Sequence, residues 1–347
     1  MRAHRTLALA AALATLGVLG ACGGERGAPA AAPPVAQSAL DHPVLLDYSP
    51  TLSDVGALLY LAAHPDVDLR GVTLAGTGES RCAAAVPNTL ALLDLAGRSD
   101  VPVACGRTEP IGPGNEWPAL WRDAADKLAP LELADTVDPE RVVGSANALL
   151  STVAGEAADA GGVVVVALGP LTNIADAIDT DPGIVEKIAM VWSMGGALGV
   201  AGNAPGSAAE WNFYVDPTAV DVVLRSGVPT ALVPLDATNH VPADYGLYRR
   251  LTQIDDSPAA EAVLDLWTGA MPWRIDMFLW DELTAVVAAE PALAPLVPQR
   301  IEMVTSGPDA GRTVTSADGV EVLVAGRPDR RAVEAELLDR LAAAPAG

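Results

Sequence analysis

The stretch PVLLDYSPTLSDVGAL, residues 43–58, joins a short apolar run to a segment with apolar residues at helical spacing. Pro43–Leu46 is typical of a buried strand, and a helix is predicted to begin at Asp54. The turn between them carries several oxygen-bearing side chains: Asp47, Ser49, Thr51, Ser53 and Asp54. Open α/β sheets bind their ligands at this carboxyl edge of the strands.

This turn offers only hard oxygen donors, with no His or Cys. Such a set suits Ca²⁺ or Mg²⁺ rather than Zn²⁺. A purely structural interpretation is also open, because Asp47 can simply end the strand and Ser53 or Asp54 can cap the helix. Taken alone, the stretch favours the structural interpretation.

The rest of the chain repeats the pattern of strand, polar loop and helix. Further strands are predicted at 69–74, at 101–105, in GGVVVVAL (161–168) before the turn at Gly169-Pro170, at 188–192 and at 229–234, with a strand pair near 311–313. Helices are predicted at 86–96, 139–153, from Asn173, and at 217–225, 257–269 and 332–342. Such repeats predict a single α/β domain, a mostly parallel open sheet with helices on both faces. Its polar loops should meet at one edge.

Composition narrows the range of partners. The 347 residues are 50% hydrophobic, which is enough for one large core, and the net charge is -23 with only 21 Lys and Arg. A phosphate backbone would be repelled from most of such a surface. Nucleic acid is therefore excluded as a partner, whereas a homo-oligomer is left open.

The first 22 residues are predicted to be an export signal. Basic residues precede an apolar stretch at 7–19 that is short for a membrane span. The following Leu19-Gly20-Ala21-Cys22 resembles a bacterial lipobox, which predicts lipidation of Cys22; ordinary cleavage would leave a free thiol. Residues 23–40, rich in Gly, Ala and Pro, are expected to be a flexible tether, and residues 41–347 the folded domain. The protein is thus expected on the outer face of a bacterial cell membrane, attached only through lipid.

Two other cysteines, Cys82 and Cys105, remain. An exported compartment permits a disulfide between them, but two free thiols fit the sequence equally well.

Three further groups of polar or aromatic residues are candidates for a binding site. Trp117 and Trp121 lie on a Gly- and Pro-rich loop, where they either pack the loop down or offer a flat face to a ring-shaped ligand. A later loop carries Asn203, Glu210 and Asn212, which can hydrogen-bond sugar hydroxyls. Asp281, after Trp280, begins a helix as a cap or reaches a metal.

Five motifs, taken in order, resemble the inosine-uridine preferring nucleoside hydrolase family. They are LLDYSPTLSD (45–54), ALGPLTN (167–173), MGGALGVAGNAPGSAAEWNFYVDP (194–217), PLDATNHV (234–241) and LWDELTAVVAAEP (279–291). PALWRD (118–123) and LWDELT are most similar to the purine-preferring branch. The resemblance covers the chain from about Pro43 onward, and it implies the Rossmann-like fold of that family.

The resemblance implies a Ca²⁺-dependent N-glycosidase that splits a ribonucleoside into ribose and free base. It implies that Asp47 binds the ion and deprotonates water. The other implied ion ligands are Asp54, Asp281, the backbone oxygen of Leu168 and, in place of a family aspartate, Ser53. The implied ribose contacts are Asn203, Glu210, Asn212 and Met194, with Glu79 suggested as a further one, and Trp121 and Trp280 are implied to stack on a purine.

The chain departs from the family pattern in the aspartate-rich turn. Ser49 and Ser53 stand where aspartates are usual, and Thr51 replaces a glycine. Loss of a carboxylate should weaken Ca²⁺ binding, because affinity at such sites follows ligand charge. Two hypotheses follow: an exported nucleoside hydrolase, which the retained Asp47 and Asp281 favour, or a nucleoside- or sugar-binding lipoprotein without turnover.

Overall fold

A mostly parallel sheet forms the centre of the protein in the computed structural model, which describes residues 36–133 and 137–343. In this part of the chain the sheet has nine strands in the order β3-β2-β1-β4-β5-β6-β9-β7-β8. Pairings from β3 to β9 are parallel, while β7 and β8 add antiparallel strands at one edge. The strands are β1 (Val44–Tyr48), β2 (Leu69–Leu74), β3 (Val103–Cys105), β4 (Val163–Ala167), β5 (Ile188–Met194), β6 (Thr230–Val233), β7 (Leu296–Met303), β8 (Thr313–Thr315) and β9 (Val320–Ala325).

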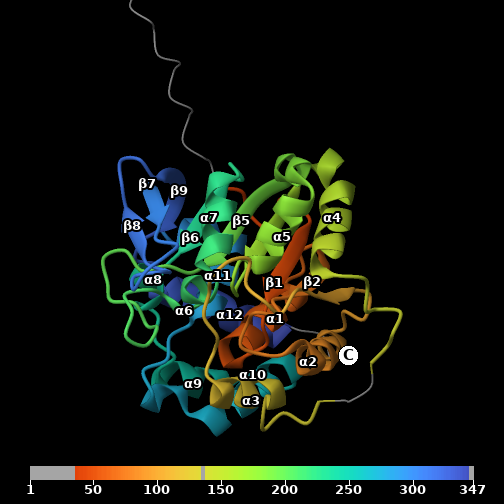
Figure 1. Ribbon diagram of the computed structural model, residues 1–347. Helices are drawn as coiled ribbons and strands as arrows, with labels where there is room; N and C mark the ends of the chain where they lie inside the picture. Colours follow the sequence, from red (N-terminus) through yellow and green to blue (C-terminus); the bar gives the residue numbers. More distant parts are fainter. Residues whose placement is uncertain (1–35, 134–136, 344–347) are drawn as a thin grey trace, which may run out of the picture. The chain divides into compact units, whose positions relative to one another are not determined.

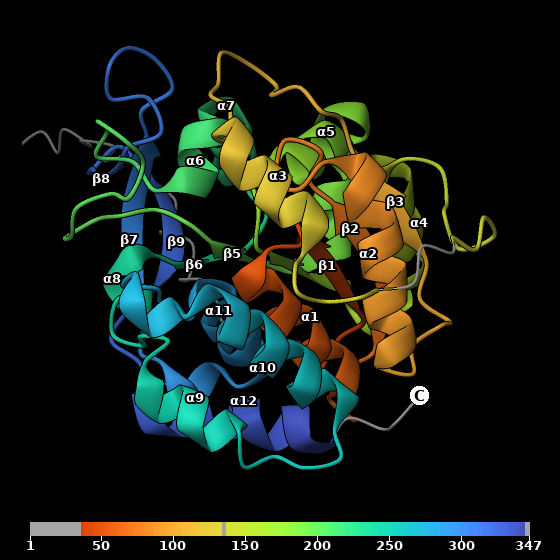
Figure 2. The same cartoon turned by 90° about the horizontal axis from the view of Figure 1, so that it is seen from below.

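Helices cover both faces of the sheet (Figures 1 and 2). One face is covered by α1 (Leu52–Ala63), α2 (Cys82–Leu95) and α11 (Trp280–Ala289). Two further helices, α10 (Pro258–Ala270) and α12 (Arg330–Ala343), pack on α1 on the side away from the sheet. The other face is covered by α4 (Ala146–Glu156), α5 (Thr172–Thr180) and α7 (Pro217–Arg225). The remaining helices among the described residues are α3 (Ala119–Lys127), α6 (Trp211–Val215), α8 (Leu235–Thr238), α9 (Tyr245–Leu251), η1 (Ala158–Ala160), η2 (Pro182–Lys187), η3 (Pro272–Arg274) and η4 (Pro291–Leu293).

The burial of the central strands explains their sequences. Every residue of β1 and β4 is buried, because helices pack on both faces of the sheet. Strands covered on both faces have continuous apolar runs rather than alternation. The VVVVA run of β4 is such a sequence. The predicted fold class is therefore confirmed, and sheet topology brings the loops after β1, β2, β4 and β5 to one carboxyl edge.

Two predicted helices have other bounds. The helix expected over 139–153 begins only at Ala146, since Gly144 has φ +43° and Ser145 is extended. Conversely, α2 begins at Cys82, several residues before the predicted start. The loop with the two tryptophans contains a helix, α3, that the sequence did not indicate because it is short, buries only Ala125 and follows a Gly- and Pro-rich stretch.

The expected tether ends earlier than residue 40. Ala39 is fully buried, and its backbone N–H donates to the oxygen of Ala288 at 2.7 Å. The indole nitrogen of Trp192 donates to the oxygen of Gln37 at 2.8 Å. Residues 37–40 are thus part of the folded domain. The expected signal peptide, Cys22 and the remaining tether up to residue 35 lie outside the described residues.

Cys82 and Cys105 form a disulfide with Cα atoms 5.9 Å apart, which decides between the two alternatives left by the sequence. It joins the start of α2 to the end of β3. Among the described residues, no helix combines the length and apolar character needed to cross a bilayer.

Candidate active site

The largest of the cavities described here, about 680 Å³, lies at the carboxyl edge of the sheet. Residues from seven separated segments line it, including nearly all of the predicted site residues: Ser53, Asp54, Glu79, Trp121, Leu168, Met194, Asn203, Glu210, Asn212, Trp280 and Asp281. Asp47 is fully buried beside this lining, where its backbone oxygen accepts from the N–H of Leu168 at 2.8 Å. The structure therefore brings the predicted set together.

Asp47 is held by two donors at one oxygen. The hydroxyl of Thr73 and the amide of Asn173 each donate to Asp47 Oδ1 at 2.6 Å, whereas the buried Oδ2 has no hydrogen-bond partner. Burial raises the pKa of Asp47 to about 6, although the two hydrogen bonds lower it. The side chain is thus fixed in position with one oxygen free to take a proton near neutral pH.

Several buried carboxyl groups lie close to one another. Burial, and then the charge of Asp281, raise the pKa of Asp54 well above its usual value. Burial raises the pKa of Asp281 to about 7, opposed by the hydrogen bond from Ser53. Burial, and then Asp281, raise the pKa of Glu79 to about 7. Without a cation, these groups destabilise one another's charged forms.

The donors match a hard cation in chemical type. Asp54 Oδ1, like Asp47 Oδ2, is buried without a hydrogen-bond partner. However, no three His, Cys, Asp or Glu side chains within residues 36–133 and 137–343 gather closely enough to form a ready metal site. Ser53 instead donates a hydrogen bond to Asp281 Oδ2. The residues therefore fit Ca²⁺ by donor type, while a preformed carboxylate cage is absent from this part of the chain.

The residues expected to bind ribose brace one another. Glu210 caps α6 and accepts from the backbone N–H of Asn212 at 3.0 Å. The Asn212 amide donates to the backbone oxygens of Leu168 at 2.9 Å and Met194 at 3.3 Å. One lone pair of the Leu168 oxygen is thus already used. Asn203 accepts from the backbone N–H of Trp211 at 2.9 Å, through Oδ1.

Aromatic rings form one wall of the pocket. Trp117 stacks on Trp211 with ring centroids 4.6 Å apart, and Trp121 lies 5.4 Å from Trp211. Trp121 is 46% exposed, so part of its face is free. Trp280 lines the same pocket from the start of α11. The two predicted stacking residues therefore face a common space, and Trp211 belongs to the wall although sequence analysis gave it no role.

Asn173 and Thr73 are further site residues that sequence analysis missed. Asn173 closes the ALGPLTN motif, so its place at the start of a helix after a strand was a usable signal. Thr73 lies within β2 and gave none, because a buried threonine is common in strands.

Glu210 makes the stability of the ligand-free protein dependent on pH. Burial raises its pKa from 4.5 to about 7, so the folded state binds the proton more tightly than the unfolded state. Stability should therefore fall as pH rises through this window. Thermal melts in chelator should show a higher Tm at pH 5 than at pH 8, with a smaller difference in Glu210→Gln. An equal difference in that variant would contradict the assignment.

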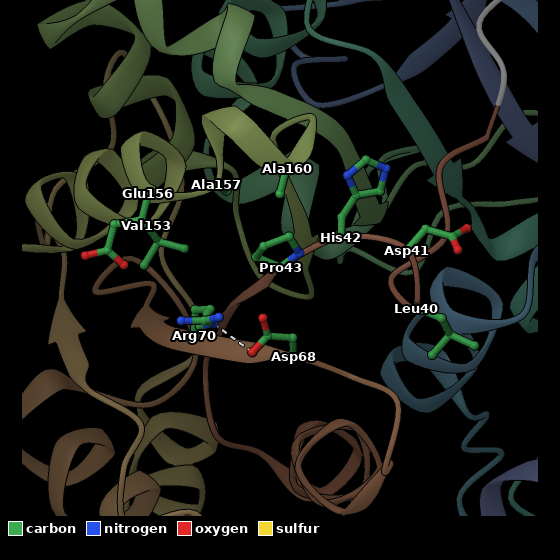
Figure 3. Close-up of a pocket in the computed structure, with 10 residues that line it drawn as sticks. All are labelled: Leu40, Asp41, His42, Pro43, Asp68, Arg70, Val153, Glu156, Ala157 and Ala160. Atoms are coloured by element: carbon green, nitrogen blue, oxygen red, sulfur yellow. Dashed lines mark hydrogen bonds and ion pairs between the residues drawn. The ribbon is translucent and has the colours of Figure 1, made fainter.

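Another cavity, of about 360 Å³, lies at the opposite, amino edge of the sheet (Figure 3). Its Arg70 is paired with Asp68 at 2.7 Å, and its other carboxylates are Asp41 and Glu156. None of the predicted site residues lines it. The chemistry is therefore assigned to the pocket at the carboxyl edge.

Comparison with known proteins shows the family of this chain. The model of the family "Inosine-uridine preferring nucleoside hydrolase" matches residues 44–340. The pyrimidine-specific ribonucleoside hydrolase RihA of Klebsiella pneumoniae is 32% identical over 251 residues, covering 67% of this chain and 73% of that protein. The rice protein named probable uridine nucleosidase 2 is 35% identical over 58% of each chain.

Solved structures show the same fold. A plant nucleoside hydrolase, PpNRh1, matches with a TM-score of 0.77 and 28% identity, over 88% of this chain and all of that one. A purine-preferring ribonucleoside hydrolase from Gardnerella vaginalis matches with a TM-score of 0.73 and 26% identity, over 86% and 98%. These matches place the chain in the class of nucleoside hydrolases. It belongs to the inosine-uridine preferring nucleoside hydrolase family.

Proposed function

We propose that this protein hydrolyses the N-glycosyl bond of ribonucleosides, preferably purine ribonucleosides, and that Asp47 deprotonates the attacking water. The observation that carries the proposal is the state of Asp47: it is buried, fixed by Thr73 and Asn173, and retains one unpartnered oxygen. A carboxylate in this state is suited to general-base catalysis.

The acidic lining supports glycosidic cleavage. Bond breaking passes through an oxocarbenium-like state, in which positive charge develops on the sugar. Glu210 and Asp281 line the pocket and are buried, so their negative charges act in an environment of low dielectric. We infer that Asn203, Glu210 and Asn212 bind the ribose, with Met194 beneath it and Glu79 as a further contact.

The ion that we propose is Ca²⁺. Asp47, Asp54, Asp281, the backbone oxygen of Leu168 and the hydroxyl of Ser53 would hold it. When bound, such an ion lowers the pKa of its water. The unpartnered oxygens of Asp47 and Asp54 support this assignment. The pairing of Ser53 with Asp281 suggests weaker binding than a full set of carboxylates would give.

The tryptophan wall supports a purine preference. Trp121 and Trp280 provide flat apolar surfaces in a pocket of about 680 Å³, and a stacked base leaves more readily when an aromatic wall holds it. The names of the relatives do not decide between bases, since RihA is called pyrimidine-specific and the Gardnerella enzyme purine-preferring.

Removal of the Trp121 ring tests this preference. Trp121→Ala should raise the KM for inosine about three- to tenfold, because an aromatic contact contributes roughly 0.5–1.5 kcal/mol. The KM for uridine should change less. Leu120→Ala is the matched control, since Leu120 is the neighbouring side chain, is 82% exposed and does not line the pocket. Equal effects on both substrates would contradict a purine-stacking role.

We also propose that the protein acts outside the cytoplasm, attached through lipid at Cys22. The disulfide between Cys82 and Cys105 supports this location, because such bonds persist in oxidising compartments. Radiolabelled palmitate incorporated by the wild type, and lost in Cys22→Ser, would test the anchor.

One observation favours a second function, the binding of nucleosides without cleavage. Because Ser53 donates to Asp281, one oxygen of an expected ion ligand is already engaged. A protein unable to hold the ion would bind nucleosides without cleaving them.

The deciding experiment incubates protein lacking residues 1–22 with inosine, guanosine and uridine, in Ca²⁺ or in chelator, and measures the reducing sugar released. Release that stops in chelator supports the hydrolase. Tight binding in calorimetry without any release would support the nucleoside-binding protein instead.

A further inference from the structure

Helix α3 presents Trp121 to the pocket but is weakly held by apolar packing. Ala125 is its only buried residue, and most of its other side chains are exposed. A short helix with so little buried apolar surface is expected to move readily unless polar contacts fix it. Its position, which sets that of Trp121, must therefore depend on other interactions.

Asp126 supplies those interactions from α3. Its Oδ1 accepts from the backbone N–H of Arg81 at 2.7 Å and from the hydroxyl of Ser80 at 3.2 Å, and its Oδ2 accepts from the Arg81 guanidinium. Its backbone oxygen accepts from the amide of Asn88 at 3.1 Å. The Asp126 side chain thus accepts three hydrogen bonds from the loop between β2 and α2. Asp123 and Arg122 of the same helix each contact this loop through one further hydrogen bond.

The same loop contacts the opposite side of the pocket. Glu79, directly before Ser80, lines the pocket, and the backbone N–H of Ser80 donates to Ser49 Oγ at 2.8 Å. Ser49 follows β1 and lies two residues after Asp47. The contacts therefore run from the turn of Asp47, through Ser49 and Ser80, to Asp126 and the helix of Trp121. Figure 2 shows α3 beside α2 at this edge.

We propose that Asp126 is a positioning residue that fixes the base-stacking Trp121 relative to the ribose side of the pocket. The inference rests on the proposed function, since it assigns the coupling to nucleoside binding. It also gives Ser49 a role in place of the missing aspartate: its hydroxyl accepts the backbone N–H that holds the loop.

Asp123 provides a matched control on the same helix. It also pairs with the Arg81 guanidinium, at 2.9 Å, but no backbone N–H of the loop donates to it. Its side chain is 54% exposed, against 19% for Asp126. Removing Asp123 takes away a similar surface charge and leaves the attachment of the loop intact.

The test measures steady-state cleavage of inosine by the wild type, Asp126→Ala, Asp126→Asn and Asp123→Ala. Asp126→Ala should raise KM about tenfold with a smaller change in kcat, because a hydrogen bond to a charged group contributes about this factor. Asp126→Asn keeps an oxygen acceptor and should stay within about threefold of the wild type, and Asp123→Ala within about twofold.

A double-mutant cycle separates positioning from a general loss of structure. In a Trp121→Ala background, Asp126→Ala should add less than about twofold to KM, because the ring that it positions is absent. A full additional tenfold effect, or an equal effect of Asp123→Ala, would overturn the inference. Should Asp126→Ala fail to fold, Ser80→Ala removes one donor from the loop side and is expected to give the same non-additivity with Trp121→Ala.

Different results would overturn the proposed hydrolase function and the proposed role of Asp126. A wild type that cleaves no nucleoside would overturn the proposed function, whether or not it binds one. An active wild type in which Asp126→Ala retains the normal KM would overturn only the role of Asp126.

Discussion

Asp47→Asn is expected to lower kcat for nucleoside hydrolysis by about 10³-fold, within the range contributed by a general base. The amide keeps the size of the carboxyl group and one oxygen for the donors Thr73 and Asn173, so the fold should persist. It cannot accept the proton of the attacking water. Single-turnover release of ribose from inosine measures the effect, and binding of inosine should change much less than kcat.

Asp276→Asn is the control for this substitution. Asp276 also lines the pocket, but it is exposed and belongs to none of the hydrogen-bonded groups around Asp47. The control should retain nearly full activity. An Asp47→Asn variant that kept more than about a tenth of the wild-type kcat would show that another group accepts the proton.

Ser53→Asp should produce the largest change in ion binding. The added carboxylate replaces the hydroxyl that donates to Asp281, so it brings a further negative charge into a cluster that already raises the pKa of its members. Ca²⁺ affinity should increase about tenfold or more, since each added charge strengthens a hard-cation site. Without Ca²⁺ the same charge should lower Tm, because like charges then repel.

Calorimetric titration and thermal melts measure the two effects. The rise in Tm on adding Ca²⁺ should be larger in Ser53→Asp than in the wild type, since a ligand that binds only the folded state stabilises it by mass action. Ser49→Asp is the comparison at the other substituted position. Unchanged Ca²⁺ affinity in Ser53→Asp would show that the ion does not lie beside residue 53.

The sheet and most of the site could be predicted because both depend on local patterns. Buried parallel strands have continuous apolar runs, and polar residues that follow such runs meet at one edge whatever their separation in the sequence. For this reason Asp47 and Asn212 could be assigned to one edge of the sheet, whereas Asp281 was assigned to the same site only through the resemblance to the family. The first residues of α2 and α4 were predicted wrongly. Pro87 and Gly144 interrupt the apolar spacing near these starts, and the sequence does not show whether each helix begins before or after the interruption.

The hydrogen-bond partners of the site residues could not be predicted from the same patterns. Nothing in the sequence joins Asn173 to Asp47, Ser53 to Asp281 or Asp126 to Arg81, because each pair is fixed by tertiary packing. Helix α3 was missed since it buries a single side chain and so lacks an apolar stripe. The geometry of the site therefore depends on hydrogen bonds between distant segments, and such bonds leave no repeating pattern in the sequence.

The packing of residues 37–40 has a consequence for how the enzyme can be attached to a support. These residues contact the end of α11, and β1 begins only at Val44, so the chain enters the domain on the side away from the pocket mouth. A protein shortened to begin at residue 36 and coupled to a resin bead through its amino terminus should therefore keep the substrate entrance facing the bulk solution. Nucleosides should then reach the pocket of the immobilised enzyme as easily as that of the enzyme in solution.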